Sequence, residues 1–308
     1  MDPLQRAHDG RTSCLARVGA EILNAMTVDV EEHFQVTAFD GFVPREDWDA
    51  IPSRVEDNTI RLLDLFDEHD VKSTFFVLGW VGERHPRLLR RIAAAGHEVG
   101  CHGYSHRLIY DQTPADFRSE LSLARRILQD ASGHLVDGHR AASFSIQRRN
   151  LWALDIVVEA GFSYDSSLFP VLHDRYGIPG APRGLYRLNT PSGGELVEAP
   201  PATVVLGGMV LAVGGGGYLR LYPKFLFDWA IRRLNRAERM SAILYVHPWE
   251  VDPTQPRVHG VPWSRSFRHY LNLDETLGKL RHLVRSHRFA PLGEVIRAAG
   301  PLPLTRLG

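Results

Sequence analysis

The chain has 308 residues, which is enough for one large α/β domain or for two smaller ones. Lys and Arg together number 36, and so do Asp and Glu, so the formal net charge is zero. This balance provides no overall positive field for nucleic acid or for an anionic membrane surface. We therefore expect no nucleic-acid partner, and a neutral substrate, small or polymeric, is the simpler expectation.

The cysteines and the first residues bear on the cellular compartment. Cys14 and Cys101 are the only cysteines, far apart in the sequence, and two unpaired thiols indicate a reducing environment. Residues 1–23 lack the continuous apolar core of a secretory signal. No run approaches the roughly 18 apolar residues of a membrane span. We expect a cytoplasmic chain without a transmembrane helix, with association through a membrane complex left open, and residues 1–23 as an extension preceding the fold.

Hydrophobic runs and helical patterns alternate along the chain. In order, they predict a strand at 25–30, a helix at 54–68, a strand at 72–80, a helix at 85–96, a strand at 97–103, a helix at 114–131, a strand at 136–144, a helix at 150–161 and a strand at 162–169. A helix at 223–236, a strand at 241–251 and a helix at 274–287 follow later. Repeated strand-then-helix order argues for a parallel sheet with covering helices. We expect one barrel-like α/β domain, and a doubly wound open sheet is the competing architecture.

The segment from about 170 to 218 interrupts this alternation. It is rich in proline and glycine and contains "TPSGGELVEAPPATVV", which suits an inserted hairpin. The glycine run Gly214–Gly217 has no following GKS or GKT and does not match a phosphate loop, so it predicts a flexible turn. The expected domain spans 24–302, and 303–308 are expected to form a tail.

Acidic side chains stand at the end of the first predicted strand, in "TVDVEEHF". Ligands of parallel α/β proteins gather at the carboxyl ends of the strands, so polar residues there carry the most information. A strand period of two places Asp29 and Glu31 on the same face. Two carboxylates in one cavity repel each other unless a cation shares the site. A solvated strand end is the alternative, and Glu32 and His33, nearer the turn, are given no role.

Two histidines follow another predicted strand, in "GCHGYSHRL". His102 and His106 have the spacing HxxxH, and their imidazoles meet on one side if the chain turns helically there. This spacing suits one divalent ion, with a carboxylate as third ligand and water in the open position. Ordinary surface or hydrogen-bonded histidines are the alternative.

Two further strand ends carry candidate groups. Arg140, in "HRAASFS", could hold a carboxylate bidentately, or it could form an ordinary surface ion pair. His247, in "LYVHPWE", could protonate a leaving group, or it could be a core histidine with satisfied hydrogen bonds. Trp249, Trp263 and Phe267 could form an aromatic platform for sugars, with core or rim packing as the alternative.

Taken together, the segments "TVDVEEHFQV", "STFFVLGWVGERHP", "GHEVGCHGYSHRLIY", "HRAASFSI", "FSYDSSLFP", "YVHPWEVDP" and "FRHYLNL" resemble one known family. The chain is similar, from about Asn24 to Leu302, to the polysaccharide deacetylases, also called the NodB-homology or carbohydrate esterase 4 family. Within it, the chain resembles the subgroup associated with exosortase and PEP-CTERM exopolysaccharide loci. The resemblance implies a distorted (β/α) barrel and a divalent metal, zinc by expectation and cobalt or manganese as alternatives.

The resemblance also implies roles at the start of the chain. The family's first motif, TFDD, is similar to 27–30, which makes Asp29 the general base. Val30 replaces the usual second acid, a metal ligand, so the resemblance assigns that role to Glu31, one residue later on the same strand face. His102 and His106 match the HxxxH motif and complete the metal ligands.

The remaining motifs imply groups that assist catalysis. Arg140 matches the arginine that orients the catalytic acid, and the amide of Ser143 takes the position of the oxyanion hole. Asp165 matches the fourth motif and would support the general acid. His247 matches the histidine of the LxH motif and would protonate the departing amine.

The expected function is metal-dependent hydrolysis of N-acetyl groups on a polysaccharide or oligosaccharide, in exopolysaccharide biosynthesis. The expected partner is therefore an N-acetylated glycan, while the oligomeric state is left open. Two alternatives remain, namely a hydrolase of small amides or ureides on the same fold and a non-catalytic glycan-binding protein.

Overall fold

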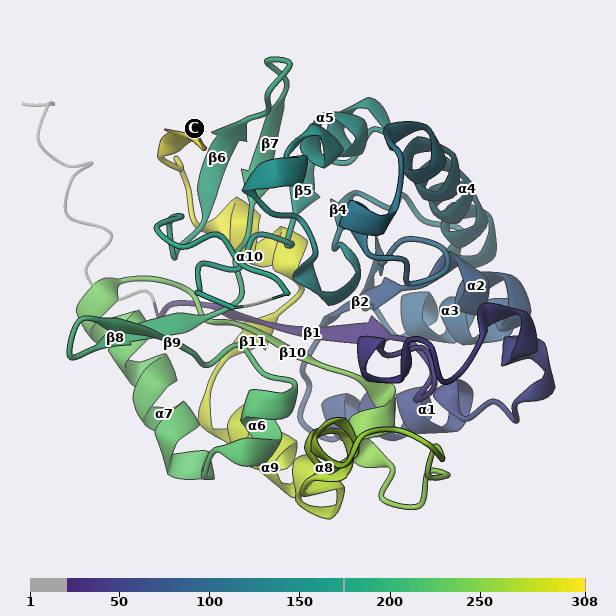
Figure 1. Ribbon diagram of the computed structural model, residues 1–308. Coiled ribbons are helices and arrows are strands. Elements are labelled where there is room, and N and C mark those ends of the chain that lie inside the picture. Colours follow the sequence, from purple (N-terminus) through teal and green to yellow (C-terminus); the bar gives the residue numbers. More distant parts are fainter. Residues whose placement is uncertain (1–20, 174, 308) are drawn as a thin grey trace, which may run out of the picture.

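The computed structural model describes residues 21–173 and 175–307, which form a mixed α/β fold around one large sheet (Figure 1). The strands of this sheet are β1 (Asn24–Val30), β2 (Thr74–Val77), β3 (Glu98–Cys101), β4 (Gly138–His139), β5 (Tyr164–Asp165), β6 (Tyr186–Asn189), β7 (Glu195–Glu198), β10 (Ile243–Val246), β11 (Phe289–Ala290) and β12 (Leu304–Arg306). Their order is β10-β1-β2-β3-β4-β5-β7-β6-β12, and β11 also pairs with β1. The pairs from β10 to β5 are all parallel, which confirms the predicted fold class.

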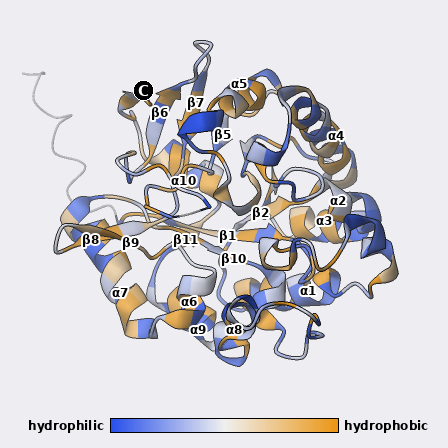
Figure 2. Cartoon of the chain, viewed as in Figure 1, coloured by the Kyte–Doolittle hydropathy of each residue, from blue (hydrophilic) through white to orange (hydrophobic). Residues whose placement is uncertain are grey.

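The sheet is not closed by hydrogen bonds among the described residues. Strands β10 and β12 stand at its two ends, so the barrel suggested by the family resemblance is an open one here. All seven residues of β1 are buried, as expected for a central parallel strand that is covered on both faces. Figure 2 shows hydrophobic residues concentrated along these inner strands.

Helices surround the sheet. They are α1 (Val55–Asp67), α2 (Gly79–Arg84), α3 (Pro86–Ala94), α4 (Pro114–Ser132), α5 (Trp152–Glu159), α6 (Gly217–Leu221), α7 (Lys224–Arg233), α8 (Trp263–Tyr270), α9 (Leu273–Ser286) and α10 (Leu292–Ala298). Helix α4 shows how sequence specifies such an element. Thr113 and Asp116 form a capping box at its start, and Gly133 ends it in the left-handed conformation. One face of the helix, with Phe117, Leu121, Ala124 and Leu128, is buried, and its bounds agree with the helix predicted at 114–131.

The inserted segment contains two hairpins. The first joins β6 to β7, and β7 pairs in parallel with β5, so this hairpin extends the main sheet. The second, β8 (Thr203–Leu206) with β9 (Met209–Ala212), forms a separate two-stranded sheet. The predicted tail instead contributes β12, which pairs with β6 at the edge.

The glycine run differs from the flexible turn that was predicted. Gly215, with φ of 131°, forms a bridge with Tyr245 of β10. A Cβ atom at Gly215 would lie only 1.9 Å from the Tyr245 carbonyl oxygen, so the close approach requires glycine. The run therefore packs against the strand that leads to His247.

The expectations of unpaired cysteines and of no transmembrane helix can be compared with the structure in part. Cys101 is free and buried, whereas Cys14 and most of the predicted extension lie outside the described residues. Among residues 21–173 and 175–307, no helix has the length and apolar character needed to cross a bilayer.

Candidate active site

The predicted strand-end residues come together in one cleft. Parallel strands present their carboxyl ends at the same edge of the sheet, and Asp29, Glu31, His102, His106 and His247 lie at or just after such ends. All five line a cleft of about 410 Å³. Ser143 lines it as well. These side chains therefore lie close enough together to form one site.

Glu31, His102 and His106 form a compact ligand set. One ligand atom of each lies within 4.8 Å of the others, and the three side chains are buried. The Nε2 atom of His106 lies 2.9 Å from a carboxylate oxygen of Glu31. Two imidazoles and one carboxylate are a donor set that divalent metals accept, with further positions left for water or substrate. The residues present thus fit the metal that the family resemblance implies.

The tautomer of His102 suits a ligand. Its Nδ1 donates a hydrogen bond of 2.8 Å to the carbonyl oxygen of Arg140, which leaves the lone pair on Nε2. Burial lowers the pKa of His102 to about 4, so the ring is neutral near pH 7. Both effects keep a nitrogen lone pair available.

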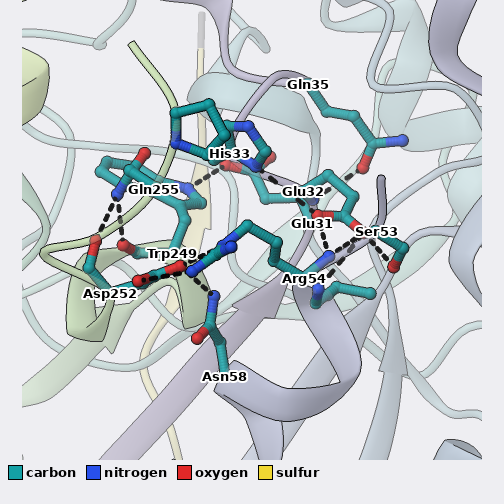
Figure 3. A network of polar contacts seen from close by, with 12 residues as sticks. Glu31, Glu32, His33, Gln35, Ser53, Arg54, Asn58, Trp249, Asp252 and Gln255 are labelled. Atoms are coloured by element: carbon teal, nitrogen blue, oxygen red, sulfur yellow. Dashed lines mark hydrogen bonds and ion pairs between the residues drawn. The ribbon is translucent and has the colours of Figure 1, made fainter. Parts of the chain in front are cut away.

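The two acids that follow β1, Glu31 and Glu32, have different surroundings (Figure 3). Burial alone would raise the pKa of Glu31, but the charge of His106 and its hydrogen bond hold that pKa well below its usual value. Trp249 donates from Nε1 to Glu31 at 3.1 Å and so fixes the carboxylate. Glu32 turns away and accepts hydrogen bonds from the amides of Arg54 and Val55, at 3.1 and 3.2 Å, where α1 begins. Glu32 therefore stabilises a helix start.

Arg140 holds Asp29. It is fully buried, and its NH1 donates to Asp29 Oδ1 and to Thr27 Oγ1, each at 2.7 Å. Its NH2 donates to Ser166 Oγ at 2.9 Å, and its guanidinium lies 4.3 Å from the centre of the Phe76 ring. A permanent charge fixed by several partners orients the carboxylate and compensates its burial. The alternative of an ordinary surface ion pair does not apply.

His247 faces the same carboxylates. Its Nε2 lies 4.0 Å from Asp29 Oδ2 and 3.7 Å from Glu31 Oε1. Its Nδ1 forms a hydrogen bond with the fully buried Glu250, and Arg220 Nε donates to the other oxygen of Glu250 at 2.9 Å. Burial by itself lowers the pKa of His247, but the hydrogen bond and charge of Glu250 raise it to about 9. The ring is therefore protonated near pH 7 in this arrangement.

Asp165 departs from its expected role. Its carboxylate binds His139 Nδ1 at 2.6 Å and Ser167 Oγ at 2.8 Å, whereas Glu250 is the carboxylate that holds His247. The register of the sheet explains this difference, because His139 of β4 pairs directly with Asp165 of β5. Glu250, and not the predicted Asp165, is therefore the carboxylate that contacts the His247 side chain through Nδ1. The only sequence signal for Glu250 is its position three residues after the histidine in "HPWE".

Ser143 stands in a strained turn beside the cleft. Ser143 and the following Phe144 both adopt left-handed φ angles, 49° and 54°, which non-glycine residues rarely do. The hydroxyl groups of Ser143 and Thr37 lie 2.5 Å apart and tie the turn to the segment after β1. Such strain is typical of functional sites.

The predicted aromatic platform divides into two parts. Trp249 is buried and stacks on His247 and His269, with ring centroids 5.0 and 4.3 Å apart, so it packs within the site. Trp263 and Phe267, on α8, are 77% and 50% exposed and stack on each other at 5.2 Å. Of the three residues of the predicted platform, Trp263 and Phe267 are the two that offer an open aromatic surface.

Two parts of the chain match known family models. Residues 47–163 match the family model described as polysaccharide deacetylase. This part of the chain is similar to the polysaccharide deacetylases. Residues 166–297, which include His247 and Glu250, match a domain of unknown function, DUF3473. Asp29 and Glu31 precede both matched ranges.

Individual relatives extend this comparison. The chain is 29% identical over 130 residues to a peptidoglycan-N-acetylglucosamine deacetylase of Bacillus cereus, which covers 38% of this chain and 47% of the relative. The chain thus spans less than half of the length of the curated relatives that head the comparison.

Two solved structures share the fold. A putative polysaccharide deacetylase of Mycobacterium smegmatis superposes with a TM-score of 0.59 at 22% identity, covering 95% of this chain and 96% of the other. The Puue allantoinase superposes with a TM-score of 0.55 at 20% identity, covering 90% and 89%. At these identities the likeness concerns the fold alone.

Proposed function

We propose that this protein is a metal-dependent hydrolase that removes N-acetyl groups from a polysaccharide or oligosaccharide. The observation that carries the proposal is one cleft that holds a His–His–Glu ligand set, a carboxylate fixed by a buried arginine, and a histidine fixed by a buried glutamate. These three parts supply what amide hydrolysis requires, namely activation of water, stabilisation of the oxyanion and protonation of the amine.

Glu31, His102 and His106 would hold the metal, zinc by expectation with cobalt or manganese as alternatives, which supplies Lewis-acid polarisation of the acetyl carbonyl and a lower pKa of water. Asp29, oriented by Arg140, accepts the proton of the attacking water. The amide of Ser143 donates to the developing oxyanion.

His247 completes the proposed reaction. Its Nε2 faces the cleft floor because Glu250 holds Nδ1, and its raised pKa keeps it protonated near pH 7. It therefore donates a proton to the departing sugar amine, and the products are acetate and a free amino sugar. The role in exopolysaccharide biosynthesis rests on the resemblance to the exosortase-associated subgroup, with which the DUF3473 match is consistent.

The alternative substrate class is a small amide or ureide. The allantoinase shares the fold, so the fold itself does not discriminate. The exposed rings of Trp263 and Phe267 favour a glycan, because a small ureide has no sugar face to cover them.

Release of acetate by the metal-loaded protein tests the proposal. We expect acetate from N-acetylated chitooligosaccharides and no turnover of allantoin. Turnover of allantoin alone would establish the small-amide activity. Glycan binding without acetate release from any acetylated glycan would establish a binding protein.

A further inference from the structure

Helix α8 forms part of the cleft wall and presents aromatic rings. Phe267 lines the cleft, and Trp263 stacks on it with an interplanar angle of 22°. The helix is anchored by the buried His269, whose ring stacks on Trp249 and contacts Phe39 with centroids 4.5 Å apart. In Figure 1, α8 lies below β1, and it contacts the short turn at Thr37–Phe39 that follows this strand. The exposed rings of Trp263 and Phe267 therefore belong to a helix that is packed firmly against the site.

The same wall carries positive charge. Arg265 and Arg268 of α8 line the cleft, and Arg175 lines it from the segment after β5. Arg268 donates from Nε to the backbone carbonyl oxygen of Ser264 at 3.2 Å. Arg265 interacts electrostatically with Asp40 but lies too far from it for an ion pair. Within residues 21–173 and 175–307, none of these three arginines forms an ion pair with a carboxylate.

Negative charge is confined to the floor of the cleft. Asp29 and Glu31 are the acidic residues among the described cleft-lining side chains, and both belong to the proposed catalytic apparatus. Arg220 also lines the cleft, but its charge is balanced by Glu250. The wall thus offers free guanidinium groups beside exposed rings. A neutral sugar could cover the rings, but it would leave the guanidinium groups without ionic partners.

We infer that the cleft binds an acidic glycan, with a carboxylate-bearing sugar placed against α8 next to the N-acetylated sugar. The C–H face of a pyranose ring covers an aromatic ring and removes apolar surface from water. The planar guanidinium groups of Arg265 and Arg268 bind a carboxylate by charge-assisted hydrogen bonds. This inference deepens the proposed function, because it names the class of glycan for the same site.

The test compares two hexasaccharides of equal length. One alternates N-acetylglucosamine with glucuronate, and the other is N-acetylchitohexaose. Binding is measured by titration calorimetry at low salt for the wild type, for the double variant Arg265→Gln/Arg268→Gln, and for Arg126→Gln, an exposed arginine of α4, as the matched control.

We expect the wild type and the control to bind the acidic hexasaccharide about tenfold more tightly than the neutral one, by analogy with rim charge pairs. The double variant should lose this preference, so that its affinities for the two hexasaccharides become equal. Raising the salt concentration to about 0.5 M should weaken only acidic binding, because exposed charges are then screened. Equal wild-type affinities, or a preference that survives in the double variant, would overturn the inference.

Acetate release separates this inference from the proposed function. Release from the neutral glycan without an acidic preference in binding overturns the acidic subsite and supports deacetylation. An acidic preference that depends on the two arginines, with no acetate from either glycan, supports the subsite and overturns deacetylation.

Discussion

Glu250 offers the sharpest test of the proposed catalytic arrangement. One carboxylate oxygen accepts from His247 Nδ1 and from the His247 backbone amide, the other accepts from Arg220 Nε, and the group is fully buried. In Glu250→Gln, the amide has only one oxygen, so the donors of either His247 or Arg220 must face an NH₂ group. An unsatisfied buried donor costs about 1–3 kcal/mol, and the charge of Arg220 also loses its partner.

We expect Glu250→Gln to lower the kcat for acetate release by about a hundredfold, with little change in KM, because His247 loses its fixed orientation and its proton. Stability should fall by about 3 kcal/mol, measured by urea unfolding. Asp165→Asn is the matched control, since it alters an equally buried carboxylate that binds His139 instead. Its kcat, corrected for the folded fraction, should stay within about threefold of the wild type. A larger loss of kcat in Asp165→Asn than in Glu250→Gln would refute this assignment.

Three further predictions concern the metal ligands, a buried histidine and the glycine run. Glu31→Ala should abolish metal binding, whereas Asp29→Asn should retain the metal and lose turnover. The metal content of each variant is measured after dialysis. Full metal content in Glu31→Ala would exclude Glu31 as a ligand. Burial lowers the pKa of His97 to about 4, so between pH 6.5 and 4 the unfolded chain binds a proton that the native protein does not. Stability should therefore fall by about 3 kcal/mol as the pH drops through this window, and His97→Gln should flatten the decline in urea melts. Gly215→Ala should cost about 3 kcal/mol, because its Cβ would lie 1.9 Å from a β10 carbonyl oxygen, while Gly217→Ala, with its nearest contact at 3.8 Å, should change stability by less than about 0.5 kcal/mol.

The helices and strands that the sequence predicted are those whose apolar residues recur at a regular spacing and are buried on one face. Helix α4 combines a capping box, an apolar stripe and a terminal glycine, and each signal lies within the segment itself. Helix α8 was missed although Trp263, Phe267 and Tyr270 recur at helical spacing, because the helix has only eight residues and most of its side chains are exposed or half-buried. Strand β12 was missed for the same reason, since Leu304 and Arg306 are exposed and its pairing with β6 depends on a distant strand.

The site was predictable where it depends on strand direction alone. Parallel strands bring their carboxyl ends together, so Asp29, Glu31 and the two histidines could be grouped from their positions. The carboxylate that binds His247 Nδ1 depends instead on tertiary packing, which the positions of the strands do not reveal. Arg220, which holds that carboxylate, follows a glycine run 30 residues earlier and carries no local signal.

The expectation of a neutral substrate shows the limit of composition as evidence. A net charge of zero sums over the whole surface, but a substrate interacts with the charges near its own binding site. Most described arginines that form ion pairs do so far from the cleft, as Arg118 does with Glu159 and Arg187 with Glu195. Such pairs cancel locally, whereas Arg265 and Arg268 leave their charge at the cleft wall. Equal totals of acids and bases are therefore compatible with a site that selects an anionic glycan, and the salt dependence of binding measures which description holds.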